Sequence, residues 1–416
     1  MGEPPSVLVL GCASGTAHGR DQMRRLSAQA RRRGLRVVGA DTPTNLDRAG
    51  LRPGPAVGAV VDHVVALDVH DPHACRSWAQ GRADLDAVTT FREMCVEPTA
   101  AVAHQLDLPG NTPDATRTIR SKDLCREHLR AAGFRQPALA VVTDLAGAER
   151  FVTAHGPGPW VVKPRDGMGS VGVTLVSAAD ELPGALDRLP GGGAFLVEEF
   201  VSGRELSAEG VVVGGEPVVL ALTEKRTTAG FVEVGHRMPA QVDPTQADVA
   251  SAHVVGAVRA VGLTRGVFHA ELWLTGQGPV MGEVHARPGG DFLHAMVEHL
   301  HPGLELYGVV LDDLLGTQQG PVPTVSGAVR AAGAQYLTVP PGVVRAVTGW
   351  DGVTGDDAVL AADLAVGPGD LVGAVDGSAD RPGVVVVGGA TPADVDAHLT
   401  RLVGAVHVDV GPAGRG

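Results

Sequence analysis

A glycine-rich segment follows a lysine in the middle of the chain. Residues 160–164 (WVVKP) are predicted to form a strand, and Gly167, Gly169 and Ser170 lie in the turn that follows Lys163. Glycine lets backbone N–H groups approach a ligand closely, and a lysine adds one compact positive charge beside them. These groups can cover a polyphosphate. The alternative interpretation is a plain β-turn that binds no phosphate.

Lysine is rare in this sequence. The 34 basic residues include three lysines, Lys122, Lys163 and Lys225, and 31 arginines. Since arginine is used wherever either cation would serve, each remaining lysine is a candidate for a site that requires an ammonium group, such as a phosphate cradle. For Lys225 the alternative is an ion pair with the neighbouring Glu224.

A predicted β-hairpin over residues 268–287 carries two acidic residues. If its turn centres on Gln277, Glu271 and Glu283 lie directly opposite each other, with Cβ atoms about 5 Å apart. Like charges at that distance destabilise the fold unless a cation lies between them, and hard oxygen ligands are typical of Mg²⁺ sites. The alternative is an exposed hairpin with incidental charges.

The second strand of this hairpin continues the pattern. With a period of two, Glu283, His285 and Arg287 project from one face, which places a guanidinium beside the predicted metal. The glycines that follow, Gly289 and Gly290, indicate a close approach of the backbone.

A third candidate is the short apolar and acidic run at residues 195–205. It is predicted to be an edge segment whose backbone can pair with adenine, and Glu205 could then accept hydrogen bonds from ribose hydroxyls. A solvated strand is the alternative.

Composition narrows the class of protein. The net charge of −13 over 416 residues excludes general binding to nucleic acid. The four cysteines show no CxxC spacing, which favours a cytoplasmic location, and no run approaches the roughly 18–20 apolar residues of a membrane span. The length predicts two or three domains.

The elements that must position these residues change along the chain. Residues 1–115 read as a small α/β domain with a βαβ opening, although its first glycine turn lacks GxGxxG. Residues 116–325 read as α+β, with a helix over 115–130 that carries Lys122, antiparallel strands and a linker at 314–326. Residues 326–416 are rich in Val and Gly and predict a small β-rich domain.

Together these motifs resemble the ATP-grasp superfamily, and the tail resembles the closing domain of L-amino acid ligases. The resemblance implies an ATP-grasp fold after a Rossmann-like pre-ATP-grasp domain. It also implies nucleotide contacts, which are Lys122 and Lys163 for phosphate, Gly167, Gly169 and Ser170 in a mobile lid over 167–172, Glu198, Glu199 and Val201 for adenine, and Glu205 for ribose.

The same resemblance assigns the reacting centre. Glu271 and Glu283 would bind magnesium, and Arg287 would be the catalytic arginine that steadies the acyl phosphate and the tetrahedral intermediate. His285 stands where the superfamily usually has an asparagine as a third metal contact. Because imidazole is softer than an amide oxygen, Mn²⁺ is an alternative metal and His285 either ligates it or lies nearby.

The substrate contacts implied by the resemblance are Glu233, His236, Arg287 and Asp291. A buried carboxylate at Asp291 needs a partner. Two alternatives remain open. Arg237 pairs with it internally, or a donor on the substrate does, which would favour polar or cationic acyl donors over Leu or Phe.

The function expected from these residues is ATP-dependent ligation of a carboxylate to an amine through an acyl phosphate, with ATP and Mg²⁺ as cofactors. Amino acids are the expected substrates, a homodimer is possible, and neither nucleic acid nor membrane is an expected partner. Two alternatives are another acyl-phosphate-forming ATP-grasp ligase and a catalytically silent ATP-binding sensor.

Overall fold

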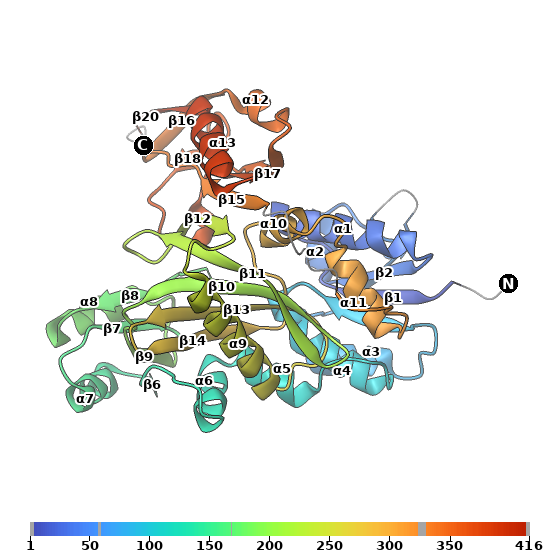
Figure 1. The fold of residues 1–416 in the computed structure, drawn as a ribbon, viewed down its shortest axis with the longest axis horizontal. Helices are drawn as coiled ribbons and strands as arrows, with labels where there is room; N and C mark the ends of the chain where they lie inside the picture. The colour runs from blue at the N-terminus through green and yellow to red at the C-terminus, as the bar shows by residue number, and fades with distance from the viewer. Residues whose placement is uncertain (1–3, 57–59, 168, 323–329, 413–416) are drawn as a thin grey trace.

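The molecule has three regions, seen in a computed structural model that describes residues 4–56, 60–167, 169–322 and 330–412. In Figure 1 the N-terminal region lies on the right, the middle region at lower left, and the C-terminal region on top. Within the described ranges the strands form sheets of five, eight, three and four strands. The predicted combination of an α/β opening and an antiparallel middle region is confirmed.

The N-terminal region is a mainly parallel sheet in the order β3-β4-β2-β1-β5. Its strands are β1 (Ser6–Leu10), β2 (Arg36–Asp41), β3 (Gly54–Pro55), β4 (His63–Ala66) and β5 (Ala87–Thr90). Its helices are α1 (Ala17–Arg32), α2 (Pro43–Arg48), α3 (Pro72–Ala79), the 3-10 helix η1 (Glu93–Cys95) and α4 (Val96–Gln105). Buried Val, Leu and Ala from β1 and β2 fill the core on both faces, as a parallel sheet requires.

The prediction of one helix over 115–130 is wrong in one respect, because the structure has two helices there. Helix α5 (Pro113–Arg120) ends and α6 (Lys122–Ala131) begins at Ser121, whose backbone is extended with φ −97° and ψ 108°. Serine favours helix caps over helix interiors. The break makes Lys122 the first residue of α6.

A four-stranded antiparallel sheet follows in the order β6-β9-β7-β8. It contains β6 (Leu139–Val142), β7 (Trp160–Pro164), β8 (Thr174–Val176) and β9 (Phe195–Glu199), with α7 (Leu145–His155), η2 (Ala179–Glu181) and α8 (Leu182–Leu186). The glycine-rich turn joins β7 to β8 as predicted. The prediction that the segment at 195–205 is an edge is wrong for β9, which lies between β6 and β7.

The largest sheet runs from the middle region into the C-terminal region in the order β14-β13-β10-β11-β12-β15-β19-β17. Its strands are β10 (Arg204–Val213), β11 (Glu216–Thr227), β12 (Glu233–Met238), β13 (Gly266–Thr275), β14 (Gly278–His285), β15 (Ala331–Tyr336), β17 (Val359–Leu364) and β19 (Gly383–Gly389). Antiparallel pairing of β12 with β15 joins the two regions. The C-terminal region is therefore held beside the middle region by main-chain hydrogen bonds.

Helices cover this sheet, and a small sheet completes the C-terminal region. The helices are α9 (Pro244–Ala260), α10 (Leu293–Leu300), α11 (Leu306–Leu314), α12 (Trp350–Thr354), η3 (Ser378–Asp380) and α13 (Pro392–Ala405). The small sheet, in the order β18-β16-β20, contains β16 (Gly342–Thr348), β18 (Leu371–Val372) and β20 (His407–Gly411). None of the helices in the described ranges is both long and apolar enough to cross a membrane.

The domain boundaries at 115/116 and 325/326 stay predictions, and the second lies outside the described residues. The same holds for the last four residues of the linker predicted at 314–326. Its first residue, Leu314, still belongs to α11 and is buried.

Candidate active site

All three lysines of the chain lie against carboxylates in one region. Lys122 Nζ lies 3.5 Å from Glu283 Oε2, and Lys163 Nζ lies 3.6 Å from Glu283 Oε1. Lys163 Nζ is also 2.7 Å from Glu198 Oε1. The lysines come from α6, β7 and β11, so the fold, and not their sequence spacing, brings them together.

Lys225 is the most deeply buried of the three, with 4% of its side chain exposed. Its Nζ lies 2.6 Å from Glu271 Oε1, 3.2 Å from Glu205 Oε1 and 3.8 Å from Glu233 Oε1. Burial alone lowers the pKa of Lys225, but these carboxylates outweigh it and raise the pKa, so the ammonium stays charged. The alternative prediction, an ion pair between Lys225 and Glu224, is wrong.

Glu224 has a different partner. It forms an ion pair with Arg204 at 2.8 Å. Neighbouring residues on a strand point to opposite faces, which separates the two side chains.

The acidic hairpin has the predicted register near the site and a different one at its tip. His269 pairs with His285 and Ala270 with Val284, but Leu272 pairs with Met281. The register shift lies between Ala270 and Leu272, so the turn is not centred on Gln277. A Cβ at Gly282 would lie 3.0 Å from Glu271 O, so the strand packs closely there and glycine fits best.

The donor set at Glu271 and Glu283 suits a hard cation. Burial raises both pKa values, but Lys225 beside Glu271 and Lys122 beside Glu283 outweigh it, and both pKa values lie well below the usual range. Both groups are therefore carboxylates with about a fifth of each side chain exposed. Within the described ranges no three His, Cys, Asp or Glu side chains form a group that could hold a metal ion.

His285 lies between two carboxylates. Its Nδ1 is 3.0 Å from Glu93 Oε2 and its Nε2 is 3.4 Å from Glu283 Oε2. Arg287 Nε donates to the same Glu93 oxygen at 2.6 Å. The predicted shared face of Glu283, His285 and Arg287 is confirmed, and ligation of a metal by His285 stays a prediction.

Glu93 was not identified from the sequence, although it holds the predicted catalytic arginine. It begins η1 of the N-terminal region, and its other oxygen accepts from Arg120 Nη1 at 2.7 Å. Burial raises the pKa of Glu93, but His285 and Arg287 outweigh it and hold the pKa well below its usual range. Its 194-residue separation from Arg287 leaves no local signal.

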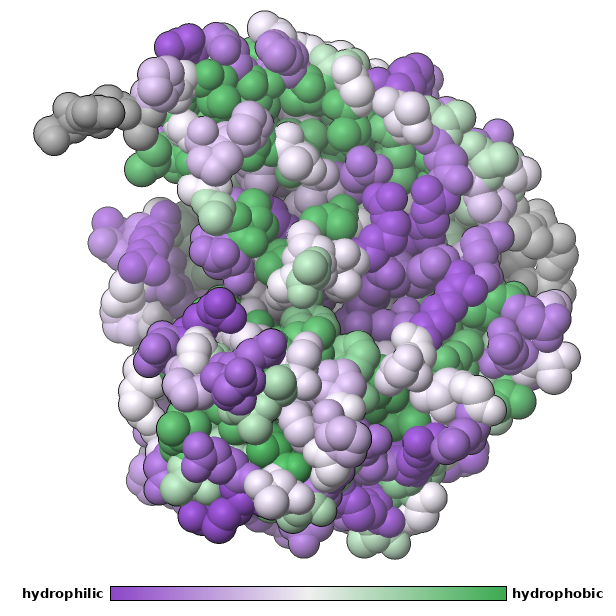
Figure 2. Space-filling model, turned by 90° about the vertical axis from the view of Figure 1, so that its left-hand side faces the viewer, coloured by the Kyte–Doolittle hydropathy of each residue, from purple (hydrophilic) through white to green (hydrophobic). Residues whose placement is uncertain are grey.

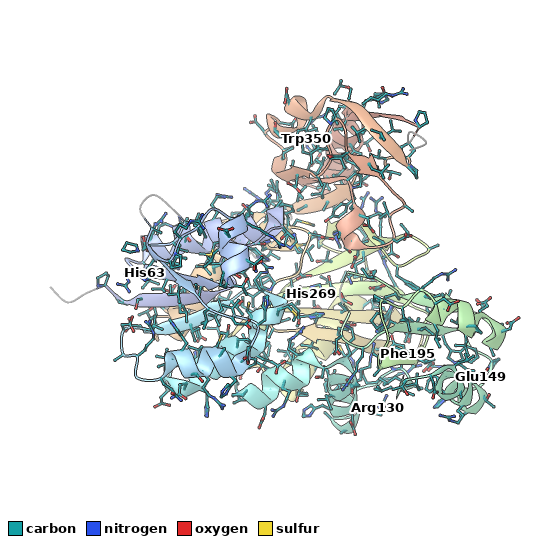
Figure 3. The ribbon with its side chains drawn as sticks, turned by 180° about the vertical axis from the view of Figure 1, so that it is seen from behind. His63, Arg130, Glu149, Phe195, His269 and Trp350 are labelled. Carbon is teal, nitrogen blue, oxygen red and sulfur yellow. The ribbon has the colours of Figure 1, made fainter. Side chains whose placement is uncertain are left out.

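A buried polar network behind Glu271 was also missed. Glu209 accepts from Ser207 Oγ at 2.8 Å and lies 2.9 Å from His269 Nδ1, while His269 Nε2 lies 3.3 Å from Glu271 Oε1. Burial lowers the pKa of His269, but Glu209 outweighs it and raises the pKa to about 9. In the sequence, two polar residues on the same face of an otherwise apolar strand, Ser207 and Glu209, could have indicated this buried network. His269 lies near the centre of the molecule in Figure 3.

The predicted nucleotide contacts lie along the other side of the lysines. Glu198 is buried in ion pairs with Lys163 and Arg126, and the Glu199 backbone N–H donates to Ala138 O at 2.8 Å. Val201 follows the end of β9. The backbone N–H groups of Glu199 and Phe200 already donate to Ala138 and Pro159, and adenine pairing by this segment stays a prediction.

The glycine-rich turn contacts three other elements. Gly167 O accepts from Lys122 Nζ at 2.9 Å, and Ser170 Oγ donates to Phe231 O at 2.9 Å. Gly169 O accepts from Ser378 N at 3.0 Å. The turn therefore lies over the lysines and touches the C-terminal region.

The predicted substrate residues also meet. His236 Nε2 lies 2.8 Å from Asp291 Oδ2, and Arg381 of the C-terminal region pairs with both Asp291 oxygens. The alternative of Arg237 as the internal partner is wrong, since Arg237 pairs with Asp396 of α13. Of the two internal partners of Asp291, His236 was among the predicted substrate contacts, whereas Arg381 was not indicated by the sequence.

The surface of the molecule is concave on one side (Figure 2). Figure 2 shows a hollow lined with hydrophilic residues between the C-terminal region at the top and the strands below. A hollow with charged walls suits a polar substrate.

Comparisons with known proteins agree with this geometry. Residues 157–295 match the family model of the ATP-grasp domain, and residues 335–411 match L-amino acid ligase C-terminal domain 2. The middle region is therefore similar to ATP-grasp domains, and the C-terminal region is similar to the C-terminal domain of L-amino acid ligases.

Solved structures support the fold. An L-amino acid ligase from Bacillus licheniformis aligns with a TM-score of 0.79 at 23% identity and covers 99% of this chain and 100% of that one. Phosphoribosylglycinamide synthetase from Anaerococcus prevotii aligns with a TM-score of 0.71 at 17% identity, over 98% and 100% of the two chains. The predicted fold class is confirmed.

Curated relatives cover part of the chain. Human carnosine synthase 1 (Homo sapiens) is 32% identical over 253 residues, which are 55% of this chain and 30% of that protein. Alanine–anticapsin ligase of Bacillus subtilis (strain 168) is 26% identical over 268 residues, 57% of this chain and 56% of that protein. The matched part is thus less than a third of the length of carnosine synthase 1.

Proposed function

We propose that this protein is an ATP-dependent carboxylate–amine ligase. A substrate carboxylate oxygen attacks the γ-phosphorus of ATP, ADP leaves, and an acyl phosphate forms. An amine then attacks the acyl carbon, phosphate leaves with the carboxylate oxygen, the nitrogen loses a proton, and an amide results. The observation that carries this proposal is the convergence of Lys122, Lys163 and Lys225 on ionised glutamates.

The residues divide the chemistry between them. Lys122 and Lys163 neutralise the phosphates, while Arg287, held by Glu93, stabilises charge on the acyl phosphate. Glu271 and Glu283 would hold Mg²⁺, which would neutralise negative charge on the phosphates. The glycine-rich turn excludes water, which would otherwise hydrolyse the intermediate.

Amino acids are the proposed substrates. Glu233 provides a partly exposed carboxylate close to Lys225, which suits the ammonium of an α-amino acid. Human carnosine synthase 1, alanine–anticapsin ligase and the L-amino acid ligase bear names that imply amino acid ligation, which supports the same class of substrate here.

The test is ADP release with ATP, Mg²⁺ and pairs of amino acids, with products identified by mass spectrometry. A donor labelled with ¹⁸O in its carboxylate should transfer one ¹⁸O to phosphate, which is diagnostic of an acyl phosphate. Lys163→Ala is the inactive control. Label that stays in the donor, or ADP release that is independent of any amine, would contradict the proposal.

A further inference from the structure

A loop of the C-terminal region closes one side of the predicted substrate site. Residues 377–381 lie between β18 and β19. Ser378 Oγ donates to Glu233 Oε2 at 3.2 Å, and Ser378 N donates to Gly169 O at 3.0 Å. Arg381 Nε donates to Ser378 O at 2.8 Å, so the backbone of the loop fixes this arginine.

Arg381 forms a two-pronged ion pair with Asp291. Nη1 to Oδ2 and Nη2 to Oδ1 are each 2.8 Å, and the two side chains are 9% and 11% exposed. The guanidinium also lies over the Tyr336 ring, 3.7 Å from Cζ to the centroid, and donates to Glu233 O at 3.1 Å. A planar guanidinium can match a carboxylate and stack on a ring at once, which an ammonium cannot do.

The backbone at Asp291 is strained. Asp291 and Phe292 adopt left-handed conformations with φ of 54° and 61°. Residues with side chains rarely adopt this conformation, and it persists where surrounding contacts impose it, often at functional sites. Arg381 on one side and His236 on the other supply such contacts.

The ion pair lies a short way from the reacting centre. Lys225 spans Glu271 at 2.6 Å and Glu233 at 3.8 Å, and the Glu233 backbone then meets Arg381. An amino acid whose ammonium meets the Glu233 carboxylate would therefore lie close to the Asp291–Arg381 pair.

On the basis of the proposed ligase function, we propose that Arg381 is a specificity-determining residue for the acyl donor. By compensating Asp291 it turns the wall of the donor pocket into a neutral ion pair, so donors with uncharged side chains are favoured over cationic or anionic ones. A carboxylate or guanidinium that loses its partner in a buried pair stays uncompensated, and a substrate of opposite charge can then replace the partner.

Two variants expose opposite charges. Arg381→Met removes the arginine partner of Asp291 and leaves His236 as its remaining contact, so the ratio of rates with L-lysine and L-alanine as donors should rise by about tenfold. Asp291→Asn leaves Arg381 unpaired and should raise the ratio for L-glutamate over L-alanine in the same way. The double variant should show neither rise. Each ratio is measured by ADP release and by the donor-induced rise in melting temperature, so the pocket is tested even without turnover.

Arg237→Met is the matched control, because Arg237 also ties β12 to the C-terminal region through Asp396 but does not contact Asp291. Its ratios should equal those of the wild type. If Arg381→Met does not fold, the donor ratios of Asp291→Asn and of the double variant test the inference. Wild-type ratios in the folded single variants, or the same shifts in Arg237→Met, would overturn the inference. Wild-type enzyme that releases no ADP with any amino acid would instead contradict the ligase proposal.

Discussion

Two charged networks in this protein use different cations. The lysine cluster is formed by Lys122, Lys163 and Lys225 with Glu198, Glu271 and Glu283. The helix network joins α1 to α10 and α11 through Asp21, Arg25, Glu298, Arg33 and Asp312. Both networks are largely buried, and in the first Arg126 approaches Glu198 through one nitrogen, at 3.2 Å, without forming a two-nitrogen pair.

An arginine that binds a carboxylate through two nitrogens fixes the relative orientation of the two side chains. Arg33 binds Asp312 with two nitrogens at 2.8 Å each, and Arg25 links Asp21 to Glu298 at 2.6 Å. These guanidinium nitrogens donate to carboxylates on α1, α10 and α11, which suits an interface between helices.

Lysines in the other network stand between carboxylates at longer and unequal distances. Lys163 is 2.7 Å from Glu198 and 3.6 Å from Glu283, and Lys225 is shared by three glutamates. A compact ammonium keeps donors available for a further anion. The helix network therefore holds helices together, whereas the lysine cluster can bind phosphate.

Exchanging the cation type should have its largest effect at Lys163. In Lys163→Arg the charge remains, but the planar group should pair with Glu198 or Glu283 and block the phosphate position. We expect ADP release to fall about a hundredfold, with little change in melting temperature. Turnover at the wild-type rate would show that only the charge matters.

Removal of Lys225 should affect both activity and metal response. In Lys225→Met, Glu271, Glu205 and Glu233 lose their shared positive charge and repel each other. We expect about a tenfold lower rate and a lower melting temperature without metal. Added MgCl₂ should raise the melting temperature of the variant more than that of the wild type, and an equal response in both proteins would contradict a cation site at Glu271.

The sequence predicted the lysine cluster better than its surroundings. Scarcity singled out Lys122, Lys163 and Lys225, and strand periodicity placed Glu283, His285 and Arg287 on one face. Both are local or compositional signals. The division into α/β and α+β regions followed from the alternation of apolar runs, and the ATP-grasp fold was implied by the resemblance of the motifs to that superfamily.

Contacts between distant segments could not be predicted in the same way. Glu93 reaches Arg287 across 194 residues, and Arg381 reaches Asp291 across 90. Periodicity also did not show that β6 would pair with β9, and the single residue Ser121 was enough to divide a predicted helix. Such features depend on how the sheets and helices pack, which no local pattern records.

The helix network should respond in stability and not in activity. Arg33→Met removes the fork to Asp312 and leaves two carboxylates of α11 and its entry, Asp312 and Glu305, without this partner. We expect the free energy of unfolding in urea to fall by about 2 kcal/mol, less than for a fully buried pair because a fifth of the arginine is exposed. ADP release per folded molecule should not change, and a large loss of activity would remove the distinction between the two networks.

The smallest effect concerns acid stability at Asp21. Burial raises the pKa of Asp21, but hydrogen bonds from His294 and Arg25 outweigh it and hold the pKa below the ordinary 3.8. Burial lowers the pKa of His294, so His294 donates as a neutral imidazole and Arg25 supplies the charge.

Because the pKa of Asp21 is depressed in the folded state, the stabilisation from Asp21 is present above pH 3.8 and is lost as the pH falls through the folded value. Asp21→Asn should therefore be less stable than the wild type by about 1 kcal/mol at pH 7, and the difference should shrink below about pH 4. Urea unfolding at a series of pH values measures this difference, and a gap that stays constant down to pH 2 would assign the effect of the substitution to packing and not to charge.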